Sequence, residues 1–211
     1  KLGFWELGLC HHYFSIDSDL VFIRPFLASD FLGPDHQPYV VSTEARTLQV
    51  DPFYFSRYWA SRQLAVESVA RHLGVSDPSF SSYHTVQVLS SSVLKNLKEE
   101  QHADRGLSYR DLMVKVPWEY FWYTTYALHQ CKVGIRRREE IVKVVHHQGE
   151  HLALLEMGVS ESSLARGYLG VIVNSNWSRQ YGLVNFDEAP LARYQESGLW
   201  GKWNDSFAGR R

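Results

Sequence analysis

The sequence contains few cysteines, no long apolar run and no excess of charge of either sign. Cys10 and Cys131 are the two cysteines among 211 residues, too few for a disulfide framework and without the spacing of a zinc site. This scarcity indicates a reducing compartment, and a single disulfide between the two stays open. No stretch of about eighteen apolar residues occurs, so we expect no membrane span in this segment.

The balance of charge disfavours nucleic acid as a partner. Twenty-two basic and twenty-three acidic residues give a formal charge of -1, so no strong positive field is available to neutralise phosphates. With 45% apolar and 14% aromatic residues, the chain can bury a substantial core. We therefore expect one globular domain over residues 1–211, in the cytoplasm or at the inner face of the membrane.

Short apolar runs alternate with amphipathic segments, which predicts an α/β fold with chemistry beyond the carboxyl ends of its strands. The run from Lys1 to Leu7 lacks an initiator methionine and reads as the middle of a helix. We therefore expect an N-terminally truncated chain. The spacing predicts strands at 13–16, 20–23, 39–42, 141–146 and 171–173, and helices at 52–73, 90–101, 108–116, 118–128 and 161–165.

An acidic triplet, Asp17-Ser18-Asp19, follows the apolar run that ends at Ile16. Two carboxylates this close in sequence can hold a hard divalent cation, which prefers oxygen ligands and retains substrate phosphates. On its own the triplet is a weak signal, because a solvated turn after a strand has the same composition. Its flanks add specificity, since the second apolar run ends in Arg24-Pro25.

The string from Tyr13 to Phe26 resembles the central motif of GT-A glycosyltransferases, where a buried strand ends in Asp-x-Asp. Together with residues 1–7, 39–44 and 118–120, it is most similar to a group of uncharacterised bacterial GT-A-like proteins, leaving a tail over residues 185–211 unassigned. The resemblance implies a GT-A-like (Rossmann-like) mixed sheet flanked by helices, lacking its N-terminal strand or strands. It also implies a Mn²⁺- or Mg²⁺-dependent hexosyltransferase that uses a nucleotide-sugar donor, most simply a UDP-sugar, and a saccharide or glycan acceptor.

The same resemblance assigns site residues. Asp17, Ser18, Asp19 and Arg24 would hold the donor diphosphate and its metal ion. His146, after the late strand, would complete the metal shell, with His147 as the next candidate, although a pair of ordinary histidines at the end of a strand is the alternative. In the resembled family a Lys-Pro-Trp sequence can follow the late strand and its histidine, and the lysine contacts the donor phosphates. That sequence is absent here, so the phosphate contacts would come from Arg24 or Lys143.

Glu119 opens an aromatic segment and is the candidate catalytic carboxylate, either as general base toward an acceptor hydroxyl or as an acceptor-positioning group. The alternative is that an acidic residue in a first turn stabilises the helix dipole. Tyr83, His84, Trp118 and Tyr120 are weaker acceptor candidates. The aromatic rings of Trp118, Trp122, Tyr123 and Tyr126 can form a sugar platform, although aromatics at helical spacing more often belong to a core.

Two other classes of function stay open. A metal-dependent phosphoester hydrolase would use the same aspartates and histidines to activate water. A non-catalytic carbohydrate-binding module derived from a transferase would bind sugar without a nucleotide. Metal-dependent binding of a nucleotide distinguishes the transferase from the second of these, and a requirement for an acceptor distinguishes it from the first.

Overall fold

The computed structural model describes residues 1–42, 60–76, 86–130, 135–146 and 148–173. These residues form a mixed α/β structure with small sheets, which confirms the predicted α/β class. The chain divides into two compact units. Unit 1 comprises residues 1–17 and 26–140, and unit 2 comprises residues 18–25 and 141–211.

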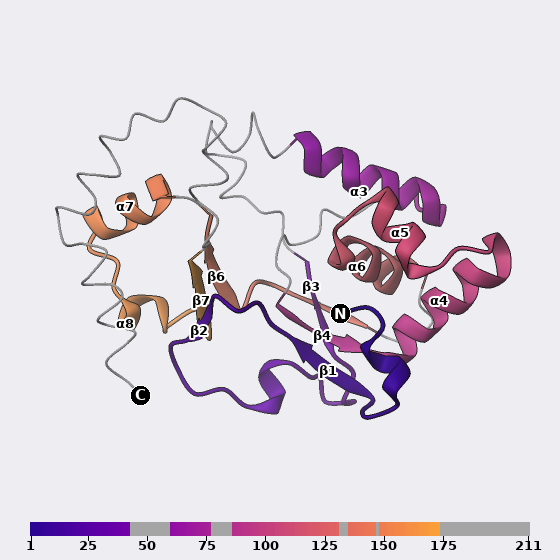
Figure 1. Cartoon of the computed structure of the whole chain (residues 1–211). Helices are drawn as coiled ribbons and strands as arrows, with labels where there is room; N and C mark the ends of the chain where they lie inside the picture. The colour runs from indigo at the N-terminus through magenta and orange to yellow at the C-terminus, as the bar shows by residue number, and fades with distance from the viewer. Residues whose placement is uncertain (43–59, 77–85, 131–134, 147, 174–211) are drawn as a thin grey trace. The chain divides into compact units, whose positions relative to one another are not determined.

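Unit 1 contains two short strand pairs and a group of helices (Figure 1). Strand β1 (His12–Ser15) runs antiparallel to β4 (Gln87–Ser90), with Ser15 opposite Gln87, and β3 (Tyr39–Val41) runs parallel to β5 (Arg136–Arg138). The helices are η1 (Phe4–Leu7), η2 (Ala28–Asp30), α3 (Ala60–Leu73), α4 (Ser91–Arg105), α5 (Tyr109–Lys115) and α6 (Glu119–His129).

Helix α6 lies at the centre of unit 1 and contacts α3, α4 and β3. Phe121, Trp122 and Tyr123 are fully buried in its core, and Tyr126 is nearly so. The rings of Trp122, Tyr123 and Tyr126 therefore pack inside the unit, and the suggestion that they form a sugar platform is wrong. The aromatic content of this helix reflects burial on all faces.

A buried polar contact links three helices of unit 1. His72 of α3 lies 2.7 Å from the Gln101 side chain on α4 through Nε2, and 2.8 Å from the ammonium of Lys115 on α5 through Nδ1. Because Lys115 can only donate, Nδ1 must accept and the ring is neutral. Burial, with the charges of Lys115 and Arg105 nearby, lowers the pKa of His72, although the bond to Gln101 acts in the opposite direction.

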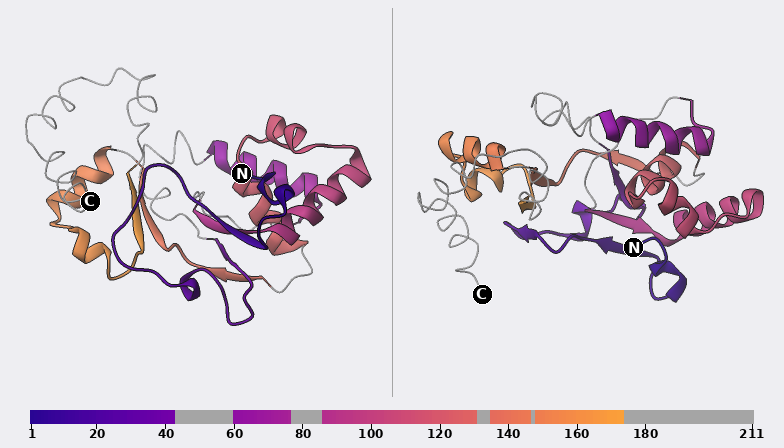
Figure 2. Two further views of the ribbon diagram at one scale, coloured as in Figure 1. Left: turned by 60° about the horizontal axis from the view of Figure 1, so that its bottom comes forward. Right: turned by 45° about the horizontal axis from the view of Figure 1, so that its top comes forward.

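Unit 2 is built on a three-stranded mixed sheet (Figure 2). Its central strand β7 (Gly170–Val173) pairs antiparallel with β2 (Leu20–Phe22) and parallel with β6 (Val142–Val145). The helices α7 (Gln148–Glu156) and α8 (Glu161–Leu164) complete it. Ile23, Val145, Leu164 and Val171 form its apolar core.

Gly170 fixes how closely β2 approaches β7. A Cβ atom at this position would lie 2.8 Å from the carbonyl oxygen of Val21 and 2.9 Å from a methyl group of Leu20. Backbone cannot yield at that distance, so glycine is required there. The close approach holds β2, and with it the end of the acidic triplet, against the sheet.

Several sequence expectations are corrected by the structure. The helix expected over the first residues is only a four-residue 3-10 turn, and Leu7 at its end is exposed. The strand before the acidic triplet is only partly buried, and Ile16, which follows it, is 49% exposed. Strands β4 and β5 and helix α7 had not been predicted.

For the part of the chain that is described, the other predicted elements are confirmed within about two residues of their expected bounds, except at the end of α4, which extends to Arg105 rather than to residue 101. Helix α3 ends before Gly74, whose φ of 73° is the left-handed conformation that favours glycine at the end of a helix. Residues 52–59, predicted to begin this helix, and the tail over 185–211 lie outside the described residues. No helix in the described ranges has the length and hydropathy needed to cross a bilayer.

Candidate functional site

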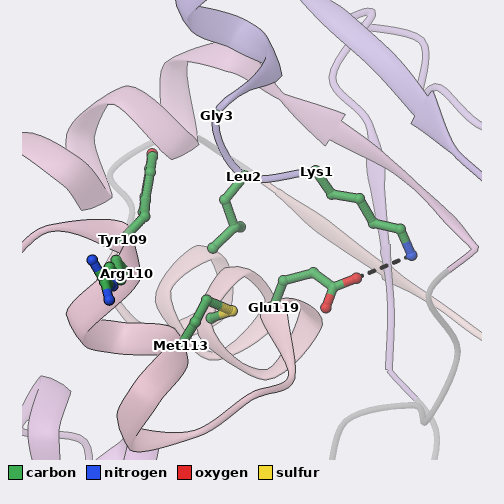
Figure 3. Close-up of a pocket in the computed structure, with 7 residues that line it drawn as sticks. All are labelled: Lys1, Leu2, Gly3, Tyr109, Arg110, Met113 and Glu119. Carbon is green, nitrogen blue, oxygen red and sulfur yellow. Dashed lines mark ion pairs between the residues drawn. The ribbon is translucent and has the colours of Figure 1, made fainter.

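Two carboxylates that were predicted for different roles form ion pairs with the same ammonium group in unit 1. The Nζ atom of Lys1 is 2.8 Å from Oδ1 of Asp17 and 3.0 Å from Oε1 of Glu119. Figure 3 shows the ion pair with Glu119 at one side of a pocket. Asp17, two residues after β1, and Glu119, in the first turn of α6, are therefore neighbours, although about a hundred residues separate them in sequence.

The position of Lys1 is fixed by its own backbone. Its carbonyl oxygen accepts a hydrogen bond from the Tyr13 hydroxyl at 2.7 Å and one from the Phe4 amide at 3.3 Å, and the next side chain, Leu2, is buried in the core. Partial burial acts to lower the pKa of Lys1, but the hydrogen bonds and charges of Asp17 and Glu119 outweigh it and raise the pKa. The ammonium therefore stays charged.

Asp19 and His146 lie at the same end of the sheet in unit 2. The register places Leu20 opposite Ile172, and Ile172 opposite Val144. Asp19 immediately precedes Leu20, and His146 immediately follows Val145. Both residues therefore lie at the end of the sheet where β6 and β7 have their carboxyl ends. One strand separates them, which is a span of about 10 Å between backbones and within the combined reach of an aspartate and a histidine on one ion.

Glu150 holds the end of β6. Its Oε2 accepts a hydrogen bond from the backbone N–H of His146 at 2.9 Å, and its Oε1 lies 2.6 Å from the ammonium of Lys143. The Lys143 and Glu150 side chains are only 10% and 17% exposed. Lys143, an alternative phosphate ligand in the sequence prediction, is therefore engaged within unit 2, and Glu150 was not predicted.

Arg24 follows β2 in unit 2. Its Nε donates to the carbonyl oxygen of Tyr168 at 3.2 Å, and its Nη1 donates to the carbonyl oxygen of Pro25 at 3.4 Å. Both bonds are to main-chain oxygens, so the positive charge has no carboxylate partner in these contacts. Ser18, the middle residue of the triplet, is exposed.

The weaker acceptor candidates have different environments. Tyr120 is buried in the core, where its ring lies 4.7 Å from that of Phe121. Trp118 is partly buried and packs edge-on against Phe121 with 5.7 Å between ring centroids. Tyr83 and His84 lie outside the described residues, as does His147.

A pocket of about 380 Å³ opens in unit 1 beside Glu119. It is bounded by the first three residues and by residues of α5, and Figure 3 shows Arg110 and Glu119 on opposite sides with Leu2 and Met113 between them. The volume falls within the usual range for small-molecule sites. The lining residues are Lys1, Leu2, Gly3, Tyr109, Arg110, Met113 and Glu119.

The described residues do not by themselves assemble a complete metal centre. No group of three or more histidine, cysteine, aspartate or glutamate side chains suited to a metal ion occurs among them. Asp17 belongs to unit 1, whereas Asp19 and His146 belong to unit 2. The predicted three-ligand metal site therefore stays a prediction.

Comparison with protein-family models gives no match to this chain, and no curated protein matches it.

Three residues of the candidate sites were not predicted from the sequence, each for a different reason. Lys1 gave no local signal of a site, and only folding brings it between two carboxylates. Glu150 could have been suspected from its place in a first turn four residues after His146, near the lone charge of Lys143 inside an apolar strand. Arg110 carried no local signal.

Proposed function

We propose that this chain is a metal-dependent glycosyltransferase domain of the GT-A type, which moves a sugar from a nucleotide-diphosphate sugar to a saccharide acceptor. The observation that supports this most is the register of β2, β7 and β6, which brings Asp19 and His146 to one end of a mixed sheet. Ligands in α/β proteins bind at the carboxyl ends of strands, and Asp19 and His146 lie at the end of the sheet where β6 and β7 have their carboxyl ends.

The donor set fits the proposed metal ion. Carboxylate oxygen and imidazole nitrogen are both suitable ligands for Mn²⁺, and His146 is held at its backbone by Glu150. Asp17 is the second carboxylate assigned to this ion by the sequence resemblance. When bound, the ion would neutralise negative charge on the leaving nucleotide diphosphate.

Arg24 and Ser18 would contact the donor phosphates. Within the described residues Arg24 donates to main-chain oxygens alone, so its charge can still pair with a phosphate. The hydroxyl of Ser18 is exposed and can donate a hydrogen bond to a phosphate oxygen.

Glu119 would face the acceptor. Its carboxylate lines the pocket and shares Lys1 with Asp17, so an acceptor hydroxyl bound by Glu119 would lie near the carboxylate assigned to the donor side. In an inverting reaction Glu119 would take the proton of that hydroxyl, and in a retaining reaction it would position the acceptor. Its place in the first turn of α6 also suits the helix dipole, and the two roles are compatible.

The test is a calorimetric titration of the full-length protein with UDP and GDP, with and without Mn²⁺. We expect Mn²⁺ to tighten UDP binding by at least about tenfold, and we expect Asp19→Asn to weaken the Mn²⁺-dependent binding by about 100-fold, because it removes a charged metal ligand. Asp104→Asn, an exposed position on α4, is the matched control and should bind like the wild type.

Three outcomes would contradict the proposal. Nucleotide binding that is independent of Mn²⁺, or that is unchanged in Asp19→Asn, would show that the proposed metal site does not exist. Saccharide binding without any nucleotide binding would identify a carbohydrate-binding module. Metal-dependent hydrolysis of a phosphate ester without an acceptor would favour a hydrolase.

A further inference from the structure

The pocket beside Glu119 is asymmetric in charge. Arg110 lies on one side, and the Glu119 carboxylate with its Lys1 partner lies on the other (Figure 3). Arg110 is exposed and forms no hydrogen bond or ion pair with other described residues, although its charge contributes, after the hydrogen bonds from Ser108, to the lowered pKa of the neighbouring Asp111. The nearest acidic side chain in sequence, Asp111, accepts hydrogen bonds from the Ser108 amide at 2.7 Å and from the Ser108 hydroxyl at 2.6 Å. The guanidinium of Arg110 is therefore available to a ligand.

The surfaces between these charged ends are apolar. Leu2 and Met113 face the pocket. Tyr109 contributes ring rather than hydroxyl, because that hydroxyl accepts from the indole N–H of Trp5 at 3.0 Å and donates to the carbonyl oxygen of Leu94 at 2.8 Å. Such walls suit the C–H face of a sugar ring, which packs against aromatic and aliphatic surface.

Glu119 offers one free acceptor to this space. Its Oε1 is paired with Lys1, and its Oε2 has no hydrogen bond among the described residues. A sugar hydroxyl can donate to that oxygen. A ligand that fits both ends therefore carries a hydroxyl at one end and an anionic group at the other.

The charge count selects a monoanion. Arg110 supplies one positive charge, and the single ammonium of Lys1 is shared by Asp17 and Glu119, which leaves that end with a net negative charge. A dianionic phosphate would find one guanidinium and a repulsive far wall. A carboxylate matches the planar fork of arginine and its single charge.

We propose that this pocket binds a hexuronic acid unit, with the carboxylate on Arg110 and a ring hydroxyl on Glu119. This rests on the proposed function, since it names the acceptor class for the same Glu119. It predicts an acidic saccharide acceptor for the transferase.

The test measures saccharide binding alone, by saturation-transfer NMR titration of the full-length protein without nucleotide or metal. The probes are methyl β-glucuronide, methyl β-glucoside and glucose 6-phosphate. We expect the glucuronide to bind about tenfold more tightly than the glucoside, because it adds a charged hydrogen bond. Arg110→Gln should abolish this preference, and Arg166→Gln, an exposed arginine of unit 2, should retain it.

Equal binding of glucuronide and glucoside, tighter binding of the phosphate, no binding of any probe, or a glucuronide preference that survives Arg110→Gln would each overturn the inference. The nucleotide titration separates this failure from that of the proposed function. Mn²⁺-dependent UDP binding without uronate binding would overturn the acceptor class alone. Uronate binding without UDP binding would retain the pocket and reject the transferase.

Discussion

Replacing Glu150 with glutamine is expected to lower the free energy of unfolding by about 3 kcal/mol, because it leaves the largely buried ammonium of Lys143 without its counter-charge. The side chain keeps its shape, and its amide oxygen can still accept from the His146 N–H, so the loss isolates the charge. Urea denaturation followed by circular dichroism measures the difference.

Two further variants make this result specific. Glu156→Gln, at the exposed end of the same helix, should change stability little. The double variant Lys143→Met with Glu150→Gln should recover most of the lost stability, because no buried charge then lacks a partner. If Glu150→Gln were as stable as the wild type, the pair would not hold β6 and α7 together as described.

Acidification is expected to remove about 3 kcal/mol of stability through His151 alone. This side chain is 1% exposed, and burial lowers its pKa to about 4 from an ordinary value of 6.5. The unfolded chain therefore binds the proton first, so the stabilising contribution is complete above about pH 6.5 and is lost as the pH falls toward 4. His72, whose pKa is also lowered, adds to the loss with the same sign.

Unfolding free energies measured by urea denaturation from pH 7.5 to 4.5 test this expectation. His151→Phe should flatten the slope below pH 6.5, because the titrating group is removed while an aromatic ring remains. His72→Phe should flatten it separately, with an added cost at neutral pH from losing the bonds to Gln101 and Lys115. A slope that both variants leave unchanged would mean that neither histidine is buried in its neutral form.

Most of the helices and strands could be predicted because each carries its own local signal. Helix α5 begins after Ser108, whose side chain forms a capping box with Asp111, and α3 ends before a left-handed glycine. Strands β4 and β5 lacked such signals. Residues 87–90 run into α4 without a breaker, and the three arginines of β5 have no strand pattern, so the partner strands determine their conformation.

The candidate site could be predicted only in part. The positions of Asp17 and Asp19 after an apolar run were visible, as was Glu119 at the start of an aromatic helix. The proximity of Asp17 to Glu119 could not be predicted, because their shared contact with Lys1 depends on how η1, β1 and α6 pack. The strand register that brings Asp19 and His146 together likewise depends on β7, which the local pattern could not pair with either strand.

The central claim is that Asp19 and His146 bind one divalent ion, and pulsed electron paramagnetic resonance of Mn²⁺ tests it most directly. In the full-length protein with Mn²⁺ and UDP, we predict nitrogen modulation from a coordinated imidazole. It should disappear in His146→Gln and persist in the exposed-site control His102→Gln. Absence of the modulation from the wild-type complex, or its persistence in His146→Gln, would contradict the claim.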